Sequence, residues 1–502
     1  MSKTQMETHP SERAVLHIMH NWGGGVERWV QDYCRTDTSR KNIVLKSIGI
    51  SGIPGQKLSL YQHIDDQNPI RVWSLTSSIF ATSIYNLDYY FALEEIISDF
   101  NVSVIMISSF IGHSLDILNT GIKTIIICHD YYPFCPAINI YFEKICRECK
   151  LSHLQSCLVE NQYNKFFPGI SASEWILIRK IFIKLILDYK ITLVVPSLSV
   201  KTNLILLEPK FGNVNFVVIP HSIEVEDLKS YQNKNLNQQK TIIQEKLKIL
   251  ILGRLSIQKG LNLFKESYEE ILKYADIILL GCGDNGILFT GTKGIEITAY
   301  NYSLNDLPRH IKKISPDIGL LLSVLPETFS YTLSELMLLG VPPLATKLGS
   351  FENRIIDELN GFLFLAEKNA LIQKIKYLSE NRNLILEVAK NLSQESHSNL
   401  QQMIDDYEKI ITSNITEINN KNLTDTSLVS VIQKQLEETQ LKIQQIQLDI
   451  EINNIIINNM RLKKHLRVPL SQKSKHFDYF KQNFFGIWEF IRRLAIKFHL
   501  FK

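Results

Sequence analysis

Short apolar runs alternate with longer helical patterns through most of this 502-residue chain, and this alternation is the strongest constraint on its fold. Apolar runs bounded by turn residues are typical of buried strands. The predicted strands are residues 14–19, 43–48, 71–75, 102–107, 124–128, 192–196, 216–219, 248–252, 277–280, 317–322 and 341–345. Strands separated by helices predict parallel sheets wrapped by helices, with functional residues at the carboxyl ends of the strands. The predicted fold class is therefore α/β.

Length and charge set further limits. A chain of 502 residues, 45% of them hydrophobic, can form two or three domains with buried cores. Residues 461–502 contain eleven Lys or Arg and two Asp or Glu, a net charge of +9, so the rest carries −5 of the total +4. This distribution argues against general nucleic-acid binding and for a separate role of the tail. The polar N-terminus and the lack of about eighteen consecutive apolar residues indicate neither a signal peptide nor a membrane span.

Residues 325–349 hold two glutamates, Glu327 and Glu335, separated by a polar and aromatic stretch. Glu335 opens an apolar helical run that Gly340 ends. The start of a helix offers unpaired backbone N–H groups and a positive dipole end, which favour a phosphate. Two carboxylates beside it can accept hydrogen bonds from hydroxyl groups. A sugar nucleotide has this combination of phosphate and hydroxyls.

A glycine-rich turn, Gly23, Gly24 and Gly25, lies between the first predicted strand and a predicted helix at 26–34. Glycines let the backbone approach a ligand closely, and the helix start favours an anion. The alternative is an ordinary tight turn. The spacing is not the dinucleotide-binding fingerprint, which argues against a Rossmann oxidoreductase.

Three further polar side chains follow predicted strands. Arg254 and Lys259 come after strand 248–252 and Gly253, just before a helical segment, and His129 comes after strand 124–128. Two cations in this position can bind a diphosphate through charge-assisted hydrogen bonds, or they can be solvated surface charges. The histidine can bond a sugar hydroxyl or phosphate, or it can be structural.

These motifs occur in an order that resembles the retaining GT-B glycosyltransferases of the family 4 type, over roughly residues 12–416. The resemblance implies two Rossmann-like domains facing a cleft. It also implies that Arg254 and Lys259 hold the diphosphate of a nucleotide sugar, that Glu327 contacts the donor sugar, and that Glu335 contacts the ribose.

The same resemblance assigns the other walls of the site. His129 closes the sugar site, and Gly23, Gly24 and Gly25 line the cleft beside the donor phosphates. Gly253 and the backbone N–H groups of Phe329, Ser330 and Tyr331 complete donor binding. The family often has glycines where Ser330 and Tyr331 stand, which bears on donor choice. No cofactor is required for catalysis in such enzymes.

A cysteine-containing insertion follows His129, at about residues 131–160. Cys135, Cys146, Cys149 and Cys157 lie within it, and Cys146 and Cys149 form a CxxC pair. Two thiolates at this spacing can share a tetrahedral ion. The alternatives are reduced cysteines in a packed loop, a structural zinc site, or an iron–sulfur site.

The C-terminal segment lies beyond the resemblance. Residues 428–466 carry an apolar heptad seam, which predicts a coiled coil or a single amphipathic helix packed on the body. After Pro469, residues 470–502 combine an aromatic stripe with basic residues. This pattern is typical of a basic amphipathic helix on an anionic membrane surface, with an ordinary docking helix as the alternative.

The predicted organisation is an N-terminal acceptor-side domain at 12–222, a connector at 223–246, a donor-binding domain at 247–390 and a crossover helix at 391–416. The predicted function is retaining transfer of a sugar from a UDP- or GDP-type donor to a glycan or lipid-linked acceptor, in bacterial surface polysaccharide assembly. The alternative is a catalytically inactive GT-B-like protein, nucleotide-responsive or a scaffold, that assembles through the coiled coil. The predicted location is cytoplasmic, with peripheral contact to the inner face of the membrane.

Overall fold

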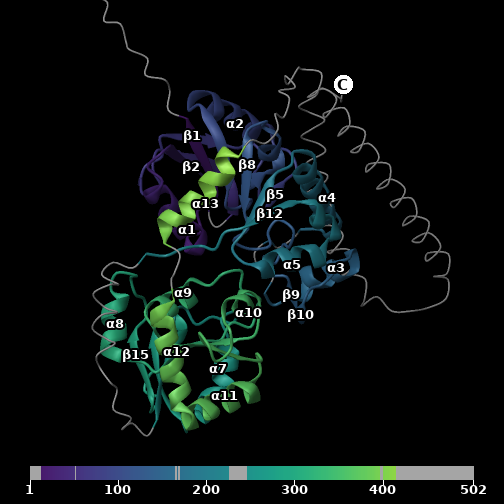
Figure 1. The fold of residues 1–502 in the computed structure, drawn as a ribbon. Coiled ribbons are helices and arrows are strands. Elements are labelled where there is room, and N and C mark those ends of the chain that lie inside the picture. Colours follow the sequence, from purple (N-terminus) through teal and green to yellow (C-terminus); the bar gives the residue numbers. More distant parts are fainter. Residues whose placement is uncertain are drawn as a thin grey trace, which may run out of the picture. The chain divides into compact units, whose positions relative to one another are not determined.

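A computed structural model describes residues 13–50, 53–163, 167, 170–224, 246–395 and 399–413. These residues form two main β-sheets, each flanked by helices (Figure 1). The predicted coiled coil and basic tail, and most of the predicted connector, lie outside the described residues. Within the described part, no helix is long and apolar enough to cross a membrane.

The first sheet has eight strands in the order β12-β11-β8-β6-β1-β2-β3-β4. The strands are β1 (Ala14–His20), β2 (Lys41–Ile50), β3 (Ile53–Tyr61), β4 (Arg71–Ser74), β6 (Val102–Ile107), β8 (Lys123–Ile127), β11 (Thr192–Val195) and β12 (Asn215–Val218). Neighbouring strands pair in parallel, except that β3 runs antiparallel to β2 and β4. The next strand along the chain, β2, lies on one side of β1, and β6 lies on its other side, so the direction of the connections switches at β1. Open α/β sheets bind their ligands at such a switch point.

The second sheet has six parallel strands in the order β15-β14-β13-β16-β17-β18. The strands are β13 (Leu247–Leu252), β14 (Ala275–Leu280), β15 (Ile295–Ala299), β16 (Ile318–Leu321), β17 (Pro343–Thr346) and β18 (Phe362–Phe364). Its order reverses between β13 and β16. These two strands therefore define a second binding edge, and they precede Arg254 and Glu327 in the chain.

Helices cover both sheets. Those associated with the first sheet are α1 (Gly24–Thr36), α2 (Leu87–Asp99), α3 (Leu151–Glu160), α4 (Ala172–Asp188), α5 (Leu198–Leu207) and α13 (Leu400–Thr412). Those of the second are α7 (Leu261–Ile271), α8 (Leu307–Ile314), α9 (Tyr331–Leu338), α10 (Ser350–Arg354), α11 (Lys368–Glu380) and α12 (Arg382–Gln394). Because successive residues of a strand face opposite ways, β1 supplies Leu16 and Ile18 to one core and Val15 and Met19 to another.

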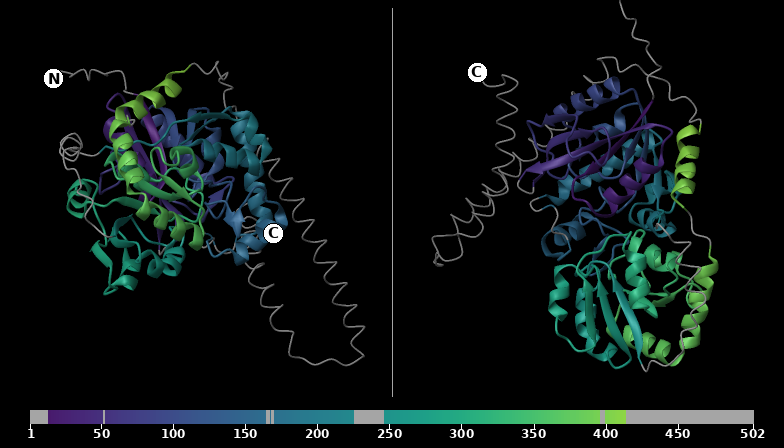
Figure 2. Two further views of the ribbon diagram at one scale, coloured as in Figure 1. Left: turned by 60° about the horizontal axis from the view of Figure 1, so that its bottom comes forward. Right: turned by 90° about the vertical axis from the view of Figure 1, so that its left-hand side faces the viewer.

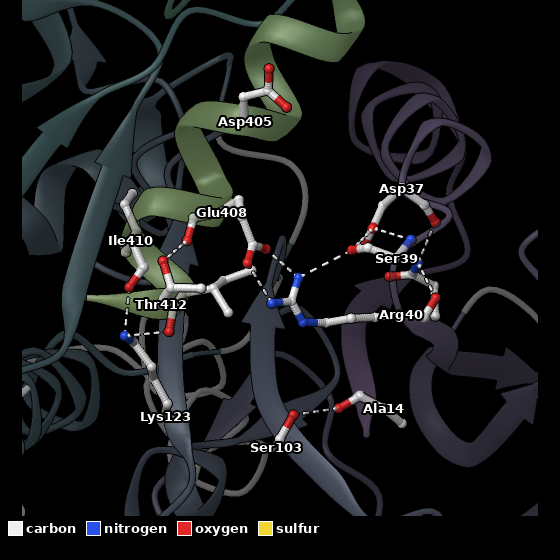
Figure 3. Close-up of polar contacts among 12 residues, drawn as sticks. Ala14, Asp37, Ser39, Arg40, Ser103, Lys123, Asp405, Glu408, Ile410 and Thr412 are labelled. Carbon is white, nitrogen blue, oxygen red and sulfur yellow. Dashed lines mark hydrogen bonds and ion pairs between the residues drawn. The ribbon is translucent and has the colours of Figure 1, made fainter. Parts of the chain in front are cut away.

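The last described helix, α13, returns the chain to the first sheet and packs beside α1 (Figure 2). Its buried residues recur at three- and four-residue intervals, as expected for a helix with one apolar face: Leu400, Met403, Ile404, Tyr407 and Ile410. Polar contacts fix its C-terminal part. Arg40 forms an ion pair with Glu408, and the Lys123 ammonium donates to the carbonyl oxygens of Ile410 and Ile411 (Figure 3).

Three features differ from the sequence prediction or add to it. Helical pattern was expected between 48 and 71, but β3 forms an antiparallel hairpin with β2 there, with Gly55 at φ 73°. Helix α9 begins at Tyr331, four residues before Glu335, because the Ser330 side chain caps it by accepting from the Leu333 N–H. The insertion after His129 forms a small hairpin, β9 (Tyr141–Phe142) and β10 (Lys144–Ile145), followed by α3.

Candidate active site

Glu327 lies in the segment between β16 and α9 and is held from several sides. The Ser323 hydroxyl donates to Glu327 Oε1 over 2.6 Å, and the Lys259 ammonium forms an ion pair with the same oxygen. Its backbone carbonyl accepts from the Ser350 N–H at 2.7 Å. The sequence predicted both Glu327 and Lys259, and the structure brings them into direct contact.

The start of α9 is fixed by a buried arginine. Arg354 donates to the carbonyl oxygens of Phe329 (2.6 Å) and Ser330 (3.1 Å), and its guanidinium lies 4.1 Å from the centre of the Phe329 ring. Burial lowers the pKa of Arg354 to about 10, so it stays charged near neutral pH. Ser330 has a φ of +72°, which this network and its own capping bond hold in place. The N–H groups at this helix start are therefore set in a fixed direction.

The backbone at Gly260 passes close to the end of β16 and so positions Lys259, one of the two predicted cations; the other is Arg254. Gly260, at φ +85°, begins α7, and a side chain there would put its Cβ 2.1 Å from the Leu322 carbonyl oxygen. Only a glycine lets the chain pass so near the end of β16. This contact sets Lys259 beside Glu327. Arg254 follows Gly253 at the end of β13 and is exposed.

The first sheet contributes the opposite wall. Gly25 lies against Tyr331, since a Cβ at Gly25 would be 3.5 Å from the Tyr331 ring. His129 follows β8, and its carbonyl oxygen accepts from the Thr328 hydroxyl at 2.6 Å. Burial lowers the pKa of His129 to about 3, so its imidazole is neutral. Its Nε2 is buried and has no hydrogen-bond partner among the described residues.

These groups surround one cavity of about 490 Å³, a size suited to a small-molecule ligand. Nine of the predicted site residues line it: Gly25, His129, Gly253, Arg254, Lys259, Glu327, Phe329, Ser330 and Tyr331. Gly23, Gly24 and Glu335 are not among its lining residues. The cavity therefore joins side chains from the carboxyl ends of strands in both sheets.

Glu335 has an unexpected partner. Its side chain is 2% exposed, and Arg28 Nη1 donates to Oε1 at 2.7 Å while the Tyr302 hydroxyl donates to Oε2 at 2.6 Å. The Arg28 guanidinium also lies 4.4 Å from the centre of the Tyr331 ring. Sequence reasoning missed Arg28, because a polar residue in the second turn of a helix carries no distinguishing signal.

Asp130 is a second cavity residue to which the sequence pattern alone gives no role. It lines the cavity beside His129, and burial raises the pKa of its carboxyl group to about 7. Its Oδ1 accepts from the Tyr132 N–H at 2.7 Å. Burial therefore favours the protonated form of this carboxyl group up to a higher pH than for an exposed aspartate.

The four predicted cysteine ligands gather in the insertion. Cys135, Cys146, Cys149 and Cys157 line a common small cavity, separate from the one described above. All seven cysteines lie within the described residues, and none forms a disulfide. As the side chains stand, no group of three or more His, Cys, Asp or Glu in the described part of the chain is arranged to hold a metal ion.

Comparison with known protein families matches residues 232–398 to the family described as glycosyl transferases group 1. No curated protein sequence matches the chain significantly. Many solved structures share its fold. HepE from Anabaena, solved in complex with UDP, is 15% identical, with a TM-score of 0.53 over 80% of this chain and 100% of that one.

Two further structures are similar to a comparable degree. A sucrose-phosphate synthase from Thermosynechococcus elongatus is 12% identical over 79% of this chain and 98% of its own, with a TM-score of 0.52. A glycosyltransferase from Rickettsia africae is 16% identical over 80% and 98%, with a TM-score of 0.51. At such low identities the likeness establishes the fold alone, which is GT-B: two Rossmann-like domains facing a cleft.

Proposed function

Because this GT-B chain carries a glycosyl transferases group 1 domain, we propose that it transfers a sugar from a nucleotide-sugar donor to a hydroxyl acceptor, with retention at the anomeric carbon. The observation that carries the proposal is the joint placement of Arg254, Lys259 and Glu327 at one cavity, beside the start of α9. Cations and a helix start suit a diphosphate, and a carboxylate suits sugar hydroxyls.

In this proposal the donor diphosphate lies against Arg254, Lys259 and the N–H groups at Phe329 to Tyr331. The diphosphate gains negative charge as it leaves, and preorganised cations stabilise that charge at the moment of reaction. Lys259 forms an ion pair with Glu327. Donor binding would therefore draw the ammonium toward phosphate and leave Glu327 to accept hydrogen bonds from the sugar.

The first domain supplies the remaining contacts. The neutral imidazole of His129 has a buried Nε2 that is available for a sugar hydroxyl or for the leaving phosphate oxygen. Glu335 takes the ribose hydroxyls, for which the carboxylate must share or exchange its bond to Arg28. Gly25 lines the cavity, and Gly23 and Gly24 precede it at positive φ, so this turn would let the backbone come close to the phosphates.

The chemical step needs no separate strong base. The bond between the anomeric carbon and the diphosphate oxygen breaks, and the acceptor oxygen forms a new bond on the same face of the sugar. The proton of the acceptor hydroxyl passes to the departing phosphate oxygen. The residues of the chain position the partners and stabilise charge, and no cofactor takes part.

The broader role is also a proposal. We place the acceptor among glycans or lipid-linked glycans of a bacterial surface polysaccharide, with the enzyme in the cytoplasm at the inner face of the membrane. The basic tail at 470–502 would supply the membrane contact, and the coiled coil at 428–466 the self-association. The proposed domains are 12–222 and 247–390, joined by a connector at 223–246 and a crossover helix at 391–416.

Thermal unfolding in the presence of UDP, GDP, ADP, CMP and their sugars tests the donor site. A ligand at a hundred times its dissociation constant adds about 2.7 kcal/mol to the stability of the folded state. We expect one nucleotide and its sugars to raise the melting temperature by several degrees. No shift with any nucleotide would refute the donor site and favour the inactive scaffold.

A pair of matched variants assigns the shift to the cavity. Lys259 and Lys265 flank the first turn of α7, but only Lys259 lines the cavity. Hydrogen bonds to charged groups contribute about 1.5–3 kcal/mol, and the 48% exposure of the Lys259 side chain favours the low end. Lys259→Ala should therefore weaken nucleotide binding about tenfold. Lys265→Ala should leave the affinity unchanged, and equal effects would contradict the assigned clamp.

Retention has its own measurement. With the donor identified, slow transfer of its sugar to water can be followed by proton NMR before the released sugar mutarotates. The first-formed sugar should have the anomeric configuration of the donor. The opposite anomer would show inversion and would exclude the proposed step.

A further inference from the structure

The insertion after His129 brings four cysteines from distant positions of the segment around one enclosed space. Cys135 lies in the segment after β8, Cys146 and Cys149 follow the β9–β10 hairpin, and Cys157 lies on α3. The shared cavity measures about 10 Å³, room for roughly one atom of the size of a water molecule. His153 and Arg179 complete its polar wall.

Three of the four sulfur atoms already have nitrogen neighbours. Arg179 Nη2 donates to Cys149 Sγ at 3.3 Å, and Asn161 Nδ2 donates to Cys157 Sγ at 3.2 Å. His153 Nε2 lies 3.4 Å from Cys146 Sγ. N–H groups around sulfur stabilise thiolates and are the usual outer partners of metal-bound ligands. Burial raises the pKa of the Cys135 and Cys146 thiols to about 12, so negative charge on these sulfur atoms requires a bound cation in addition to these donors.

Arg179 gives an independent indication of that negative charge. It is 4% exposed, and its guanidinium contacts the carbonyl oxygens of Phe134 and Cys149 and the ring of Phe134. No carboxylate among the described residues forms an ion pair with it. A buried cation without an anionic partner is costly. A centre of four thiolates and one divalent ion has a net charge of −2 and would supply that partner.

The backbone just before the hairpin and in its turn also indicates a strong local constraint. Ile138, Ile140 and Glu143 all have positive φ, at 57°, 49° and 61°. Positive φ is unfavourable for residues with a side chain, above all for β-branched ones. Such conformations persist only where the surroundings over-determine them. The strands of the hairpin are two residues each, too short to provide that constraint alone.

We propose that Cys135, Cys146, Cys149 and Cys157 bind a structural zinc ion in tetrahedral coordination. Zinc takes four thiolates at about 2.3 Å, and a closed set of four protein ligands is typical of structural sites. Among the described residues, the side chains as they stand form no group of three or more metal ligands. Coordination requires the four Sγ atoms to turn into the cavity, a change between staggered rotamers of short side chains.

The position of the site indicates a structural role for the zinc. The Ile138 N–H donates to the Cys135 carbonyl oxygen at 3.0 Å, and the Ile138 carbonyl accepts from the Tyr131 N–H at 3.2 Å. Ile138 and Asp130 both line the cavity of the candidate active site. Zinc on Cys135 would therefore hold this part of the active-site wall in place. It takes no part in any chemical step.

Metal analysis of the full-length protein, purified without chelator, tests the proposal without reference to sugar transfer. We expect about one zinc per chain. Cys149→Ser should lose the zinc, whereas the matched control Cys34→Ser, which changes a thiol on α1, should keep it. A protein without zinc that also takes up none on addition would overturn the proposal. Iron with sulfide, or disulfides among the four cysteines, would overturn it equally.

Measurements on the unaltered protein cover the case in which Cys149→Ser does not fold. Titration with an organomercurial should release zinc in proportion to the thiols modified, as read by a metal-sensitive dye. Replacement of zinc by cobalt should give the absorption of cobalt bound to thiolates in a tetrahedral site. His153→Ala should retain zinc. Loss of zinc in that variant, with retention in Cys135→Ser, would refute the proposed ligand set.

Discussion

The position of Glu327 depends on a glycine that lies 22 residues further along the chain, and this dependence can be tested. Gly349 precedes α10 with φ 58° and ψ −131°. A Cβ there would lie 2.5 Å from the Glu327 carbonyl oxygen and 2.6 Å from its nitrogen. Both atoms belong to the backbone, so no side-chain rotation can relieve the contact. Gly349→Ala must therefore displace the segment that carries Glu327.

Gly340 provides the matched control. It also has a positive φ, 68°, but no atom lies within 4 Å of where its Cβ would be. At either position, the positive φ of an alanine lowers the free energy of unfolding by about 1–2 kcal/mol. At Gly349 the contact adds overpacking of about 1–3 kcal/mol. Relief to an ordinary contact distance moves the Glu327 backbone by roughly 1 Å.

The two variants should differ in stability and in turnover. The extra cost of about 2 kcal/mol corresponds to a melting temperature roughly 4–8 °C lower for Gly349→Ala than for Gly340→Ala. A displacement of about 1 Å at a catalytic group lowers turnover about 100-fold. Turnover is measured as donor hydrolysis, which needs no known acceptor. Equal melting temperatures and equal rates would refute the idea that Gly349 positions Glu327.

Two further predictions concern buried charge. Arg28→Met should lower the free energy of unfolding by about 3 kcal/mol, because it leaves the buried Glu335 carboxylate with Tyr302 alone; the 26% exposure of Arg28 favours this low value. Urea unfolding of the double variant with Glu335→Gln should recover part of the loss, and strict additivity would contradict the pairing. Burial lowers the pKa of His113 from 6.5 to about 4, so the unfolded chain binds a proton that the folded chain does not, and stability falls as the pH falls through this window. Between about pH 7.5 and about pH 5.5 the protonation of this residue should lower the free energy of unfolding by about 1.3 kcal/mol. In urea unfolding, the loss of stability of His113→Gln over the same pH range should be smaller by that amount.

Strands such as β11, β16 and β17 could be predicted because they are short, mainly apolar runs in which every residue is buried. The parallel strand β15 was not predicted, because its residues are only partly buried or exposed and Glu296 and Thr298 interrupt its apolar pattern. β6 has the predicted bounds, Val102–Ile107, and β13 begins one residue before the predicted position. β3 escaped prediction because Lys57, Ser59 and Gly55 break its apolar pattern. An antiparallel strand near the edge of a sheet need not be apolar on both faces, so its sequence resembles a loop or a helix surface.

The site divides along similar lines. Residues that directly follow strands, such as His129, Arg254 and Glu327, could be placed at one edge because parallel strands end together. The bond between Arg28 and Glu335 joins residues 307 positions apart, and no local pattern encodes such a contact. The true start of α9 was not predicted, because Ser330 caps it at positive φ, a conformation that is uncommon for serine and that the sequence does not indicate.

The return of α13 to the first sheet has a consequence for how the protein is made. The core beside α1 includes Met403, Ile404 and Tyr407. The ion-pair partner of Arg40, Glu408, lies 368 residues further along the chain. At typical rates of synthesis, about 5–20 residues per second, the ribosome needs on the order of 20 to 70 seconds to supply that helix. The domain that emerges first is therefore completed last. Until then the faces of Trp29 and Tyr33 that α13 will cover stay open, and this interval is when the nascent chain has most need of a chaperone.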